Sequence, residues 1–565
     1  MILKALYDYY NRCGNLPAKG MEEKEIGFLI VLSPEGQFLR FEDCRTVKDH
    51  ARTYLVKKHV GRSSAAVANY LYDNSAYVLG YSDKAGGKEQ LYFDTFKAQI
   101  ETIAEAFPDS SEIQAVRAFY TNSREEIVQT VSQDPLWDDI RKNLSKKYST
   151  FSFRIEGDLR IVAEKKEILQ LEENDSSDAK FCLVSGGYGV PVDTTTATMI
   201  PGSQATAKLV AFQVNSGYDS YGKTKCGNAP ISENAEFAYT TALNSMLQKD
   251  SRNKFMLGSR TFVFWASNNN EASLETEEGL FELFGFQEKA NDDPNANLEK
   301  VRKVFESIYS GTLKTELDDK FYVLGLAPNS ARIAVVYWSE TTLKDFAGRI
   351  LQHFGDMEIH DTRKDKKPYM GIREIISSVT LGGKMSDATP NLPEAVVKSI
   401  FQGLPYPSNL YSACLRRIRA EQKLTITRAA IIKAYLNRQN SNDKIINIML
   451  DKENNNQGYL CGRLFAVLDK IQEDANHISS IRERYMNAAS ATPSAVFATI
   501  LNLSVHHSEK LDEGRRIYFE KLKQEIIEKM SANGFPTHLD LQDQGRFFVG
   551  YYHQRQDFFT SKKEQ

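Results

Sequence analysis

Apolar and polar residues alternate with two different periods in the first part of the chain. The stretch EIGFLIVLSPEGQFLRFED (25–43) has pieces with a two-residue period on both sides of a Pro-Glu-Gly turn, which is typical of paired strands. The stretch LYFDTFKAQIETIAEAF (91–107) instead repeats its apolar residues at helical spacing. The N-terminal region is therefore expected to be α+β.

Short apolar runs rich in β-branched and aromatic residues continue through the middle of the chain. Strands are predicted for FSFRIEG (151–157), AKFCLVSG (179–186), TFVFWAS (261–267) and residues 320–340. The acidic and polar stretch 268–319 predicts a surface insertion or a helical excursion.

Almost every later segment has helical periodicity. LPEAVVKSIFQGLPYP (392–407) predicts a helix stopped by prolines, so we place a boundary near Pro405. Further helices are expected at 411–422, 427–439, 457–471, 492–506 and 511–533. The predicted fold class is an α+β N-terminal region with mixed sheets, followed by an all-α C-terminal helical bundle. The expected domains are an α+β region at 1–150, a mixed α/β region at 151–404 and the bundle at 405–565.

Composition narrows the class of protein without identifying it. At 565 residues the chain is too long for one hydrophobic core, and its 41% hydrophobic and 26% charged residues are ordinary for a soluble globular protein. No run of about eighteen apolar residues and no signal-like N-terminus occur, so we expect neither export nor membrane insertion. Six scattered cysteines without a CxxC pair suit a reducing cytoplasm and argue against a zinc site.

The chain has no recognisable catalytic motif. The glycine cluster SGGYGVPVD (185–193) lacks both GxGxxG and GxxxxGK[ST] spacing, and Pro191 removes an amide where a helix would start, which favours a turn over a nucleotide cradle. GxSxG, HExxH and DFG-type sets are absent, and the nine histidines are dispersed. We therefore predict no catalytic residue, no metal site and no cofactor.

Positive charge is concentrated in a few segments, although the formal net charge is −3. Residues 45–62 hold six cations, including Lys57, Lys58 and Arg62, against one acid, an excess of five. Lysine and arginine bind phosphates without sequence preference, whereas an asparagine such as Asn69, which follows this segment, can bond base edges. The alternative is a solvated helix face.

A second basic segment, residues 412–444, holds eight cations against two acids. Several of its cations share one face if its two helices are joined by a short turn, and such a face can track a single strand or pack on an acidic partner. A third patch, TRKDKKP (362–368), is interpreted as a mobile loop that could serve either purpose or neither.

A small cationic loop, SYGKTKCGNAPIS (220–232), directly precedes a predicted helix. Its glycines allow the backbone to approach a sugar–phosphate chain closely, beside Lys223 and Lys225. Ser232 can cap the helix and leave the N-terminal amides near a phosphate. The alternative is an ordinary connecting loop with two surface lysines.

Several motifs occur together in a characteristic order. They include NYLYDNSAYVLG (69–80), EFAYTTALN (236–244), GLPYP (403–407), RRIRAEQ (416–422) and QGRFFVGYYHQRQ (544–556). In this order the chain resembles the large subunit of the subtype I-C CRISPR Cascade surveillance complex from about residue 1 to 560. Within that span, 84–135 and 268–319 hold nothing recognisable.

The resemblance implies one copy in a crRNA-guided complex with backbone, crRNA-processing and small subunits. Guide pairing would read the target, while this subunit would read a short protospacer-adjacent motif in double-stranded DNA, help to open it and handle the displaced strand. A helicase-nuclease would be recruited in trans. The C-terminal bundle would resemble the small subunit, and an internal start at Met449 would give a separate product of 117 residues.

The resemblance also suggests residue roles. Candidates for motif readout are Arg62, Ser63, Ser64, Asn69 and Asn74. Candidates for phosphate or fork contacts are Lys57, Lys58, Gly222, Lys223, Lys225 and Asn228. Candidates for a displaced-strand track are Arg416, Arg419, Lys433 and Arg438. Two alternatives stay open, namely a metal-dependent nuclease using Asp193, Glu233 and Asp361, and a purely architectural subunit.

Overall fold

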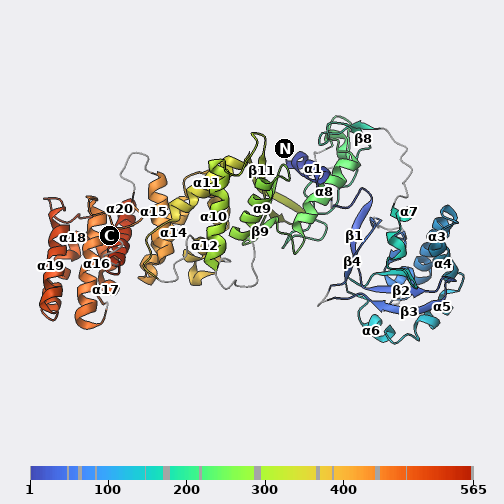
Figure 1. Cartoon of the computed structure of the whole chain (residues 1–565), viewed down its shortest axis with the longest axis horizontal. Helices are drawn as coiled ribbons and strands as arrows, with labels where there is room; N and C mark the ends of the chain where they lie inside the picture. Colours follow the sequence, from blue (N-terminus) through green and yellow to red (C-terminus); the bar gives the residue numbers. More distant parts are fainter. Residues whose placement is uncertain are drawn as a thin grey trace. The chain divides into compact units, whose positions relative to one another are not determined.

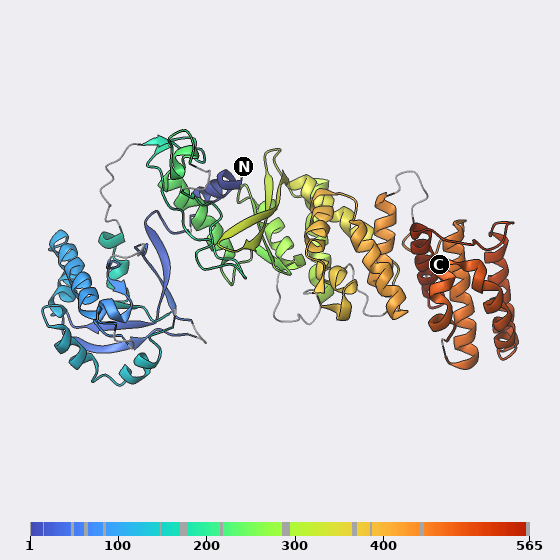
Figure 2. The ribbon, with the colours of Figure 1, turned by 180° about the vertical axis from the view of Figure 1, so that it is seen from behind.

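The computed structural model describes residues 2–14, 16–46, 50–60, 66–82, 86–146, 148–169, 179–214, 219–284, 294–363, 370–384, 387–439, 446–478 and 480–560. These residues form two compact units, which Figures 1 and 2 show from opposite sides. The small unit comprises residues 13–191 and 230–241. The large unit comprises residues 1–12, 192–229 and 242–565.

A four-stranded sheet with the order β3-β2-β6-β5 forms the centre of the small unit. Strand β2 pairs antiparallel with β3 and parallel with β6, and β5 pairs antiparallel with β6. Every residue of β2 is buried because its sequence, FLIVL, has no polar position. The strands are β1 Met21–Ile26, β2 Phe28–Leu32, β3 Phe38–Asp43, β4 Arg52–Lys57, β5 Tyr72–Asp73 and β6 Phe151–Ile155, and β1 pairs with β4 separately.

Helices pack on this sheet and close an aromatic core. They are α2 Ser75–Val78, α3 Glu89–Ala106, α4 Ser111–Phe119, α5 Arg124–Val131, α6 Trp137–Lys142 and α7 Lys166–Leu169, with the short 3-10 turn η1 Val162–Glu164. The rings of Phe93 and Phe96 on α3 contact Tyr120, whose ring also meets Phe153 of β6. The predicted α+β character of the N-terminal region, with a hairpin at 25–43 and a helix at 91–107, is confirmed.

An ion pair fastens α4 to the segment after β6. Lys165 Nζ donates a hydrogen bond to Glu112 Oε1, and this bond is the main reason why the pKa of Glu112 falls from 4.5 to about 2. Since the folded-state pKa lies below that of the unfolded chain, the carboxylate stabilises the fold above pH 4.5, and this contribution is lost as the pH falls from 4.5 to 2.

We therefore expect Glu112→Gln and Lys165→Met to flatten the pH dependence of the melting temperature in that acidic window. The double variant should melt at no lower temperature than the less stable of the two single variants, because both substitutions remove the same interaction. Thermal unfolding followed at several pH values measures this. Fully additive losses would show that the two side chains act independently.

The strand predicted at 179–186 is wrong for most of its length. Only β7 Lys180–Phe181 is extended, and it pairs with β8 Tyr188–Gly189. The chain turns at Cys182, whose carbonyl accepts a hydrogen bond from the amide of Gly186 at 3.0 Å. Gly186 has φ of 77°, a left-handed conformation that glycine adopts without steric cost, so the glycine cluster forms the predicted turn.

An antiparallel four-stranded sheet with the order β12-β11-β10-β9 lies in the large unit. Its strands are β9 Lys254–Leu257, β10 Arg260–Ala266, β11 Lys320–Asn329 and β12 Arg332–Thr342. The strands predicted at 261–267 and 320–340 are therefore confirmed, the second as a hairpin. Trp265 at its centre is fully buried and contacts the rings of Tyr322 and Trp338.

Helices surround this sheet in the large unit. They are α1 Ile2–Arg12, α8 Glu233–Leu247 (which begins in the small unit), α9 Glu271–Phe284, α10 Pro294–Ser310, α11 Leu343–Met357, α12 Ile372–Ser378 and α13 Leu392–Gln402, with 3-10 turns η2 Lys225–Asn228 and η3 Leu381–Gly383. The stretch 268–319 is thus a helical excursion, as one alternative predicted. It is not a surface insertion, because Leu280 and Phe305 are fully buried in the core.

All described elements from α13 onward are helical, which confirms the predicted class of the C-terminal part. They continue with α14 Ser408–Glu421, α15 Ile426–Gln439, α16 Gln457–Asn476, α17 Ser480–Ala491, α18 Pro493–Ser508, α19 Glu513–Glu528 and α20 Leu541–Asp557. Helices α17 and α20 were not among the predicted helices. The first is polar, and the second carries glycines and aromatic residues with low helix propensity.

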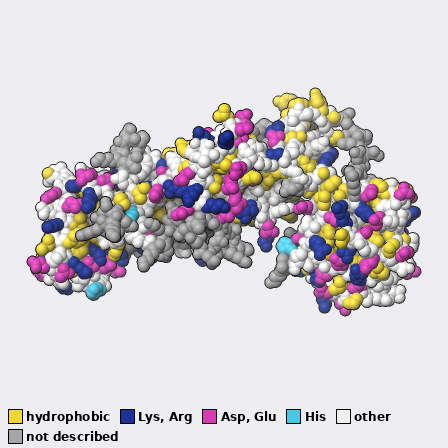
Figure 3. Space-filling view, viewed as in Figure 1, with side chains coloured by type: hydrophobic (Ala, Val, Ile, Leu, Met, Phe, Trp, Pro, Cys, Tyr) yellow, Lys and Arg dark blue, Asp and Glu magenta, His cyan; other side chains and the backbone are white. Residues whose placement is uncertain are grey.

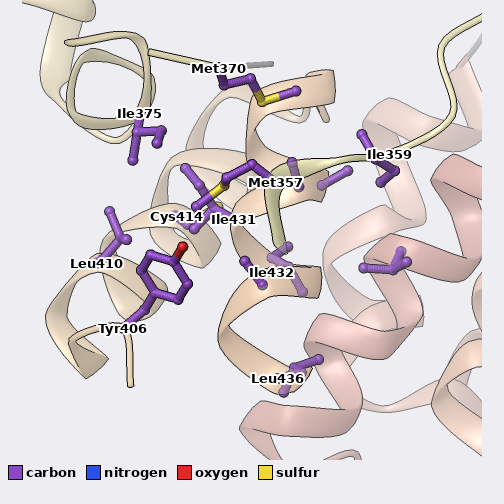
Figure 4. Packing of buried hydrophobic residues seen from close by; sticks show 14 of the residues in the cluster. Met357, Ile359, Met370, Ile375, Tyr406, Leu410, Cys414, Ile431, Ile432 and Leu436 are labelled. Carbon is purple, nitrogen blue, oxygen red and sulfur yellow. The ribbon is translucent and has the colours of Figure 1, made fainter. Parts of the chain in front are cut away.

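Glycines let α16 and α20 approach with their backbones in contact. A Cβ atom at Gly462 of α16 would lie 1.9 Å from the carbonyl oxygen of Phe547, and one at Gly550 of α20 would lie 2.3 Å from that of Tyr459. One cluster of buried apolar side chains continues from β9 to α20, and Figure 4 shows part of it around Cys414, Ile431 and Ile432. No helix within the described ranges is long and apolar enough to span a membrane.

Candidate nucleic-acid interface

A polar hollow of about 320 Å³ lies in the small unit, where the segment after β4 meets β5. It is lined by Lys24, His59, Val60, Asn69, Tyr72, Asp73, Asn74 and Thr150. Hydrogen-bonding side chains dominate this lining. The hollow can therefore accommodate a polar edge of a ligand, and it contains two of the predicted readout residues, Asn69 and Asn74.

The side chain of Asn69 is held by its oxygen. The side-chain Oδ1 accepts a hydrogen bond from the backbone amide of Val60 at 2.9 Å. The backbone amide of Asn69 donates a separate hydrogen bond to Asp73 Oδ2 at 3.0 Å. Among the described residues, none accepts a hydrogen bond from Nδ2. The bond from Val60 uses one lone pair of the oxygen, so the Nδ2 donor is the part of Asn69 that has no described partner beside the hollow.

Asn74 has a structural task. It is the N-cap of α2, and its Oδ1 accepts a hydrogen bond from the amide of Ala76 at 3.0 Å. The remaining readout candidates, Arg62, Ser63 and Ser64, lie outside the described residues.

Most described cations of segment 45–62 are compensated or buried. Arg45 forms ion pairs with Asp43 and Asp139, and His59 pairs with Glu22 at 2.8 Å. The ammonium of Lys57 lies 4.7 Å from the ring centroid of Tyr70, and only 5% of Lys57 is exposed. Lys58 is half-buried, 5.5 Å from the ring centroid of Phe237. Among the described residues of this segment, the expected excess of positive charge is therefore not an open cationic surface, because carboxylates and burial remove part of it.

The two lysines of the cationic loop differ in whether a carboxylate compensates their charge. Lys225 Nζ forms an ion pair with Asp193 Oδ2 at 2.7 Å, so its charge is compensated. Lys223 is exposed, and no ion pair joins it to any described carboxylate. Asn228 supports the loop from within, since its Nδ2 donates to the carbonyl oxygen of Ser220 at 3.5 Å and to Ser220 Oγ at 3.4 Å.

Protein acceptors occupy part of the start of α8, where a phosphate contact was predicted. Ser232 caps the helix as predicted, because its Oγ accepts a hydrogen bond from the amide of Ala235 at 3.3 Å. However, the amide of Ser232 donates to Cys182 Sγ at 3.2 Å and the amide of Glu233 donates to Val190 O at 2.8 Å. Protein acceptors thus occupy the amides of Ser232, Glu233 and Ala235, and the phosphate contact stays a prediction.

The four cations predicted to form a displaced-strand track on α14 and α15 also differ in their accessibility. Arg416 is exposed and Arg419 is half-exposed on α14. Lys433 is buried, with its ammonium donating to Gly355 O at 3.2 Å, and burial lowers its pKa. The flanking sequence AAIIKAYL is apolar on both sides of this lysine and could have predicted its burial.

Arg438 is a structural side chain inside the large unit. It pairs with Asp356, donates to the carbonyl oxygens of Ser399 and Leu404, and lies 4.3 Å from the ring centroid of Tyr406. Only Arg416 and Arg419 of the four track candidates therefore offer their charge to a strand in this structure.

The three carboxylates proposed for a nuclease each contact a cation. Asp193 pairs with Lys225 at 2.7 Å, Glu233 with Lys19 at 3.7 Å and Asp361 with Arg363 at 2.7 Å. Within the part of the chain that the structure describes, no group of three or more His, Cys, Asp or Glu side chains is arranged to hold a metal ion.

The face of the molecule drawn in Figure 3 carries both charges. Figure 3 shows Lys and Arg side chains interspersed with Asp and Glu over the face in view. The third basic patch, 362–368, lies mostly outside the described residues. Lys223, Arg416 and Arg419 are the predicted cations that the structure leaves accessible and without a described ion pair.

A search of curated proteins found no match to this chain. A family model described as CRISPR-associated protein (Cas_Csd1) matches residues 6–559, almost the entire length. The resemblance inferred from motif order is confirmed, and the family implies association with the CRISPR machinery. This chain belongs to the Cas_Csd1 family, the large subunits of type I-C CRISPR defence.

Proposed function

We propose that this protein is a non-catalytic large subunit that recognises the protospacer-adjacent motif in double-stranded target DNA. The observation that supports it best is the side chain of Asn69, which lines a polar hollow and whose oxygen accepts a hydrogen bond from the amide of Val60. A fixed donor can test base edges for an acceptor, which a mobile lysine cannot do with the same specificity.

Motif recognition would be one step in a longer sequence. Exposed cations first bind phosphates without regard to sequence, and Asn69 then inspects base edges. The duplex opens, the guide RNA pairs with one strand, and the exposed arginines Arg416 and Arg419 hold the displaced strand. A helicase-nuclease recruited in trans then acts on the opened DNA.

The proposed partners are a crRNA-containing backbone, crRNA-processing and small subunits, double-stranded target DNA and the helicase-nuclease, with the cytoplasm as the place of action. The division into 1–150, 151–404 and 405–565 is likewise a proposal about function. Ion pairing of Asp193, Glu233 and Asp361 gives no support to the nuclease alternative, since a metal site needs carboxylates directed at one ion.

The proposal is tested by titrating the assembled complex with duplexes that do and do not carry the motif, over a series of salt concentrations. Lys223→Met should weaken binding to both duplexes by the same factor and reduce the slope of log K against log salt by about 1, because one phosphate contact is lost.

Lys249→Met serves as the matched control, since Lys249 is also an exposed lysine of the large unit. It should leave the slope unchanged. Equal affinity of the wild-type complex for both duplexes at every salt concentration would overturn motif recognition. Cleavage of DNA by the purified chain with Mg²⁺ or Mn²⁺, abolished by a single substitution such as Asp193→Ala, would restore the nuclease alternative.

A further inference from the structure

The cationic loop carries an almost fully exposed aromatic ring. Tyr221 is 95% exposed, and it stands at the tip of a two-residue turn between Ser220 and Lys223. No hydrogen bond or ring contact joins it to another described residue. A single exposed tyrosine needs no explanation by itself, but the backbone that carries this ring forms a hydrogen-bonded turn.

The turn imposes an unfavourable backbone conformation on Tyr221. The amide of Lys223 donates to Ser220 O at 3.0 Å, and Tyr221 and Gly222 have φ of 54° and 70°. Two successive left-handed residues define a type I′ turn, whose usual residues are Asn, Asp and Gly. A bulky side chain is strained in this region, so Tyr221 is not required by the turn itself.

The base of the turn is braced on several sides. Asn228 donates to Ser220, the amide of Lys225 donates to Asp219 Oδ1 at 3.3 Å, and Cys226 is buried beneath. A Cβ atom at Gly227 would lie 3.2 Å from Cβ of Lys223, so this glycine leaves room for the lysine stem. The loop therefore holds Tyr221 and Lys223 outward as a fixed pair.

We propose that Tyr221 stacks on an unpaired nucleobase while Lys223 binds the adjoining phosphate. A flat exposed ring beside an uncompensated cation matches the chemistry of a single strand, whose bases offer π faces and whose backbone is anionic. Gly222 lies between the two side chains and lets the strand approach the main chain. The inference rests on the proposed function, because it requires DNA that has been opened.

The substitution that removes the ring also relieves the strain. Asparagine tolerates the left-handed conformation, so Tyr221→Asn should leave the melting temperature unchanged or raise it. A loss of DNA binding in this variant therefore cannot come from unfolding. Tyr221→Phe keeps the ring and should bind as the wild type does, whereas contact through the hydroxyl alone would make it fail.

The experiment pairs the protein variant with a change in the DNA. The assembled complex, with wild-type chain or Tyr221→Asn, is titrated with motif-bearing duplexes that carry an abasic site at successive positions beside the motif. Tyr221→Asn should weaken binding to the intact duplex by about 5- to 150-fold, the range typical of one base–aromatic stack. At one position the abasic site should cost the wild type the same factor and cost the variant nothing.

If the losses from Tyr221→Asn and from the abasic site add at every position, the stacking role of Tyr221 is overturned. The motif-free duplex distinguishes this outcome from failure of the proposed function. If the wild-type complex still prefers the motif, only the assignment to Tyr221 is wrong, whereas loss of that preference would remove the proposed function itself.

Discussion

Asn69→Asp is expected to abolish most discrimination between motif-bearing and motif-free duplexes, a loss of about 1–3 kcal/mol. In the wild type, Asn69 Oδ1 accepts a hydrogen bond from the amide of Val60 at 2.9 Å. Aspartate also has an oxygen at this position, so the hydrogen bond is kept. It replaces the amino group of a residue that lines the hollow with a second acceptor. A base-edge acceptor that bonded the amino group would then face an oxygen instead.

The measurement is the ratio of affinities for the two duplexes with the assembled complex, together with thermal unfolding. Misfolding of the small unit would weaken binding to both duplexes, whereas loss of readout lowers only the affinity for the motif. An unchanged ratio would show that Asn69 acts only through its bond to Val60.

Asn74→Asp is the matched control, because it makes the same chemical change in the same hollow. Asp is as good an N-cap as Asn, so α2 should remain capped through the bond to the amide of Ala76. We expect this variant to keep motif discrimination. Equal losses in both variants would mean that added negative charge, and not a missing donor, weakens binding.

Gly462→Ala is expected to destabilise the C-terminal helices by about 3 kcal/mol or more, the upper range for overpacking. The added Cβ atom would lie 1.9 Å from the carbonyl oxygen of Phe547 and 2.9 Å from the amide nitrogen of Tyr551. Both are backbone atoms of α20, which cannot rotate away as a side chain can. The two helices must separate, and the core between them loses contacts.

Urea unfolding of the purified chain measures this loss, with Gly355→Ala as the control. Gly355 lies near the end of α11, and a Cβ atom there would meet no atom within 4 Å. Alanine has the higher helix propensity, so this control should be neutral or slightly stabilising. Equal stability of Gly462→Ala and Gly355→Ala would mean that α16 and α20 do not pack as closely as described.

Local sequence patterns were sufficient to predict an element where a single apolar run or a single apolar face determines which residues are buried. The paired strands predicted around FLIVL (28–32) and the strand predicted at TFVFWAS (261–267) both formed, because no polar side chain interrupts their apolar runs. Helix α20 escaped prediction because its stability comes from backbone contact with α16, which helix propensity does not register. The helices within 268–319 were recognised as a possibility, but their acidic surface concealed the buried faces.

The sequence by itself determined the order of an α+β region and an all-α region, the family, and which loops carry small residues beside lysines. Only the tertiary structure decided which charges and amides are available to a ligand. Folding brings Arg45 to Asp139 and Arg438 to Asp356 as ion pairs. It also brings the amide of Val60 within hydrogen-bonding distance of Asn69 Oδ1. Electrostatic and hydrogen-bond partners are set by distances of a few ångströms in space, and separation along the chain does not report those distances.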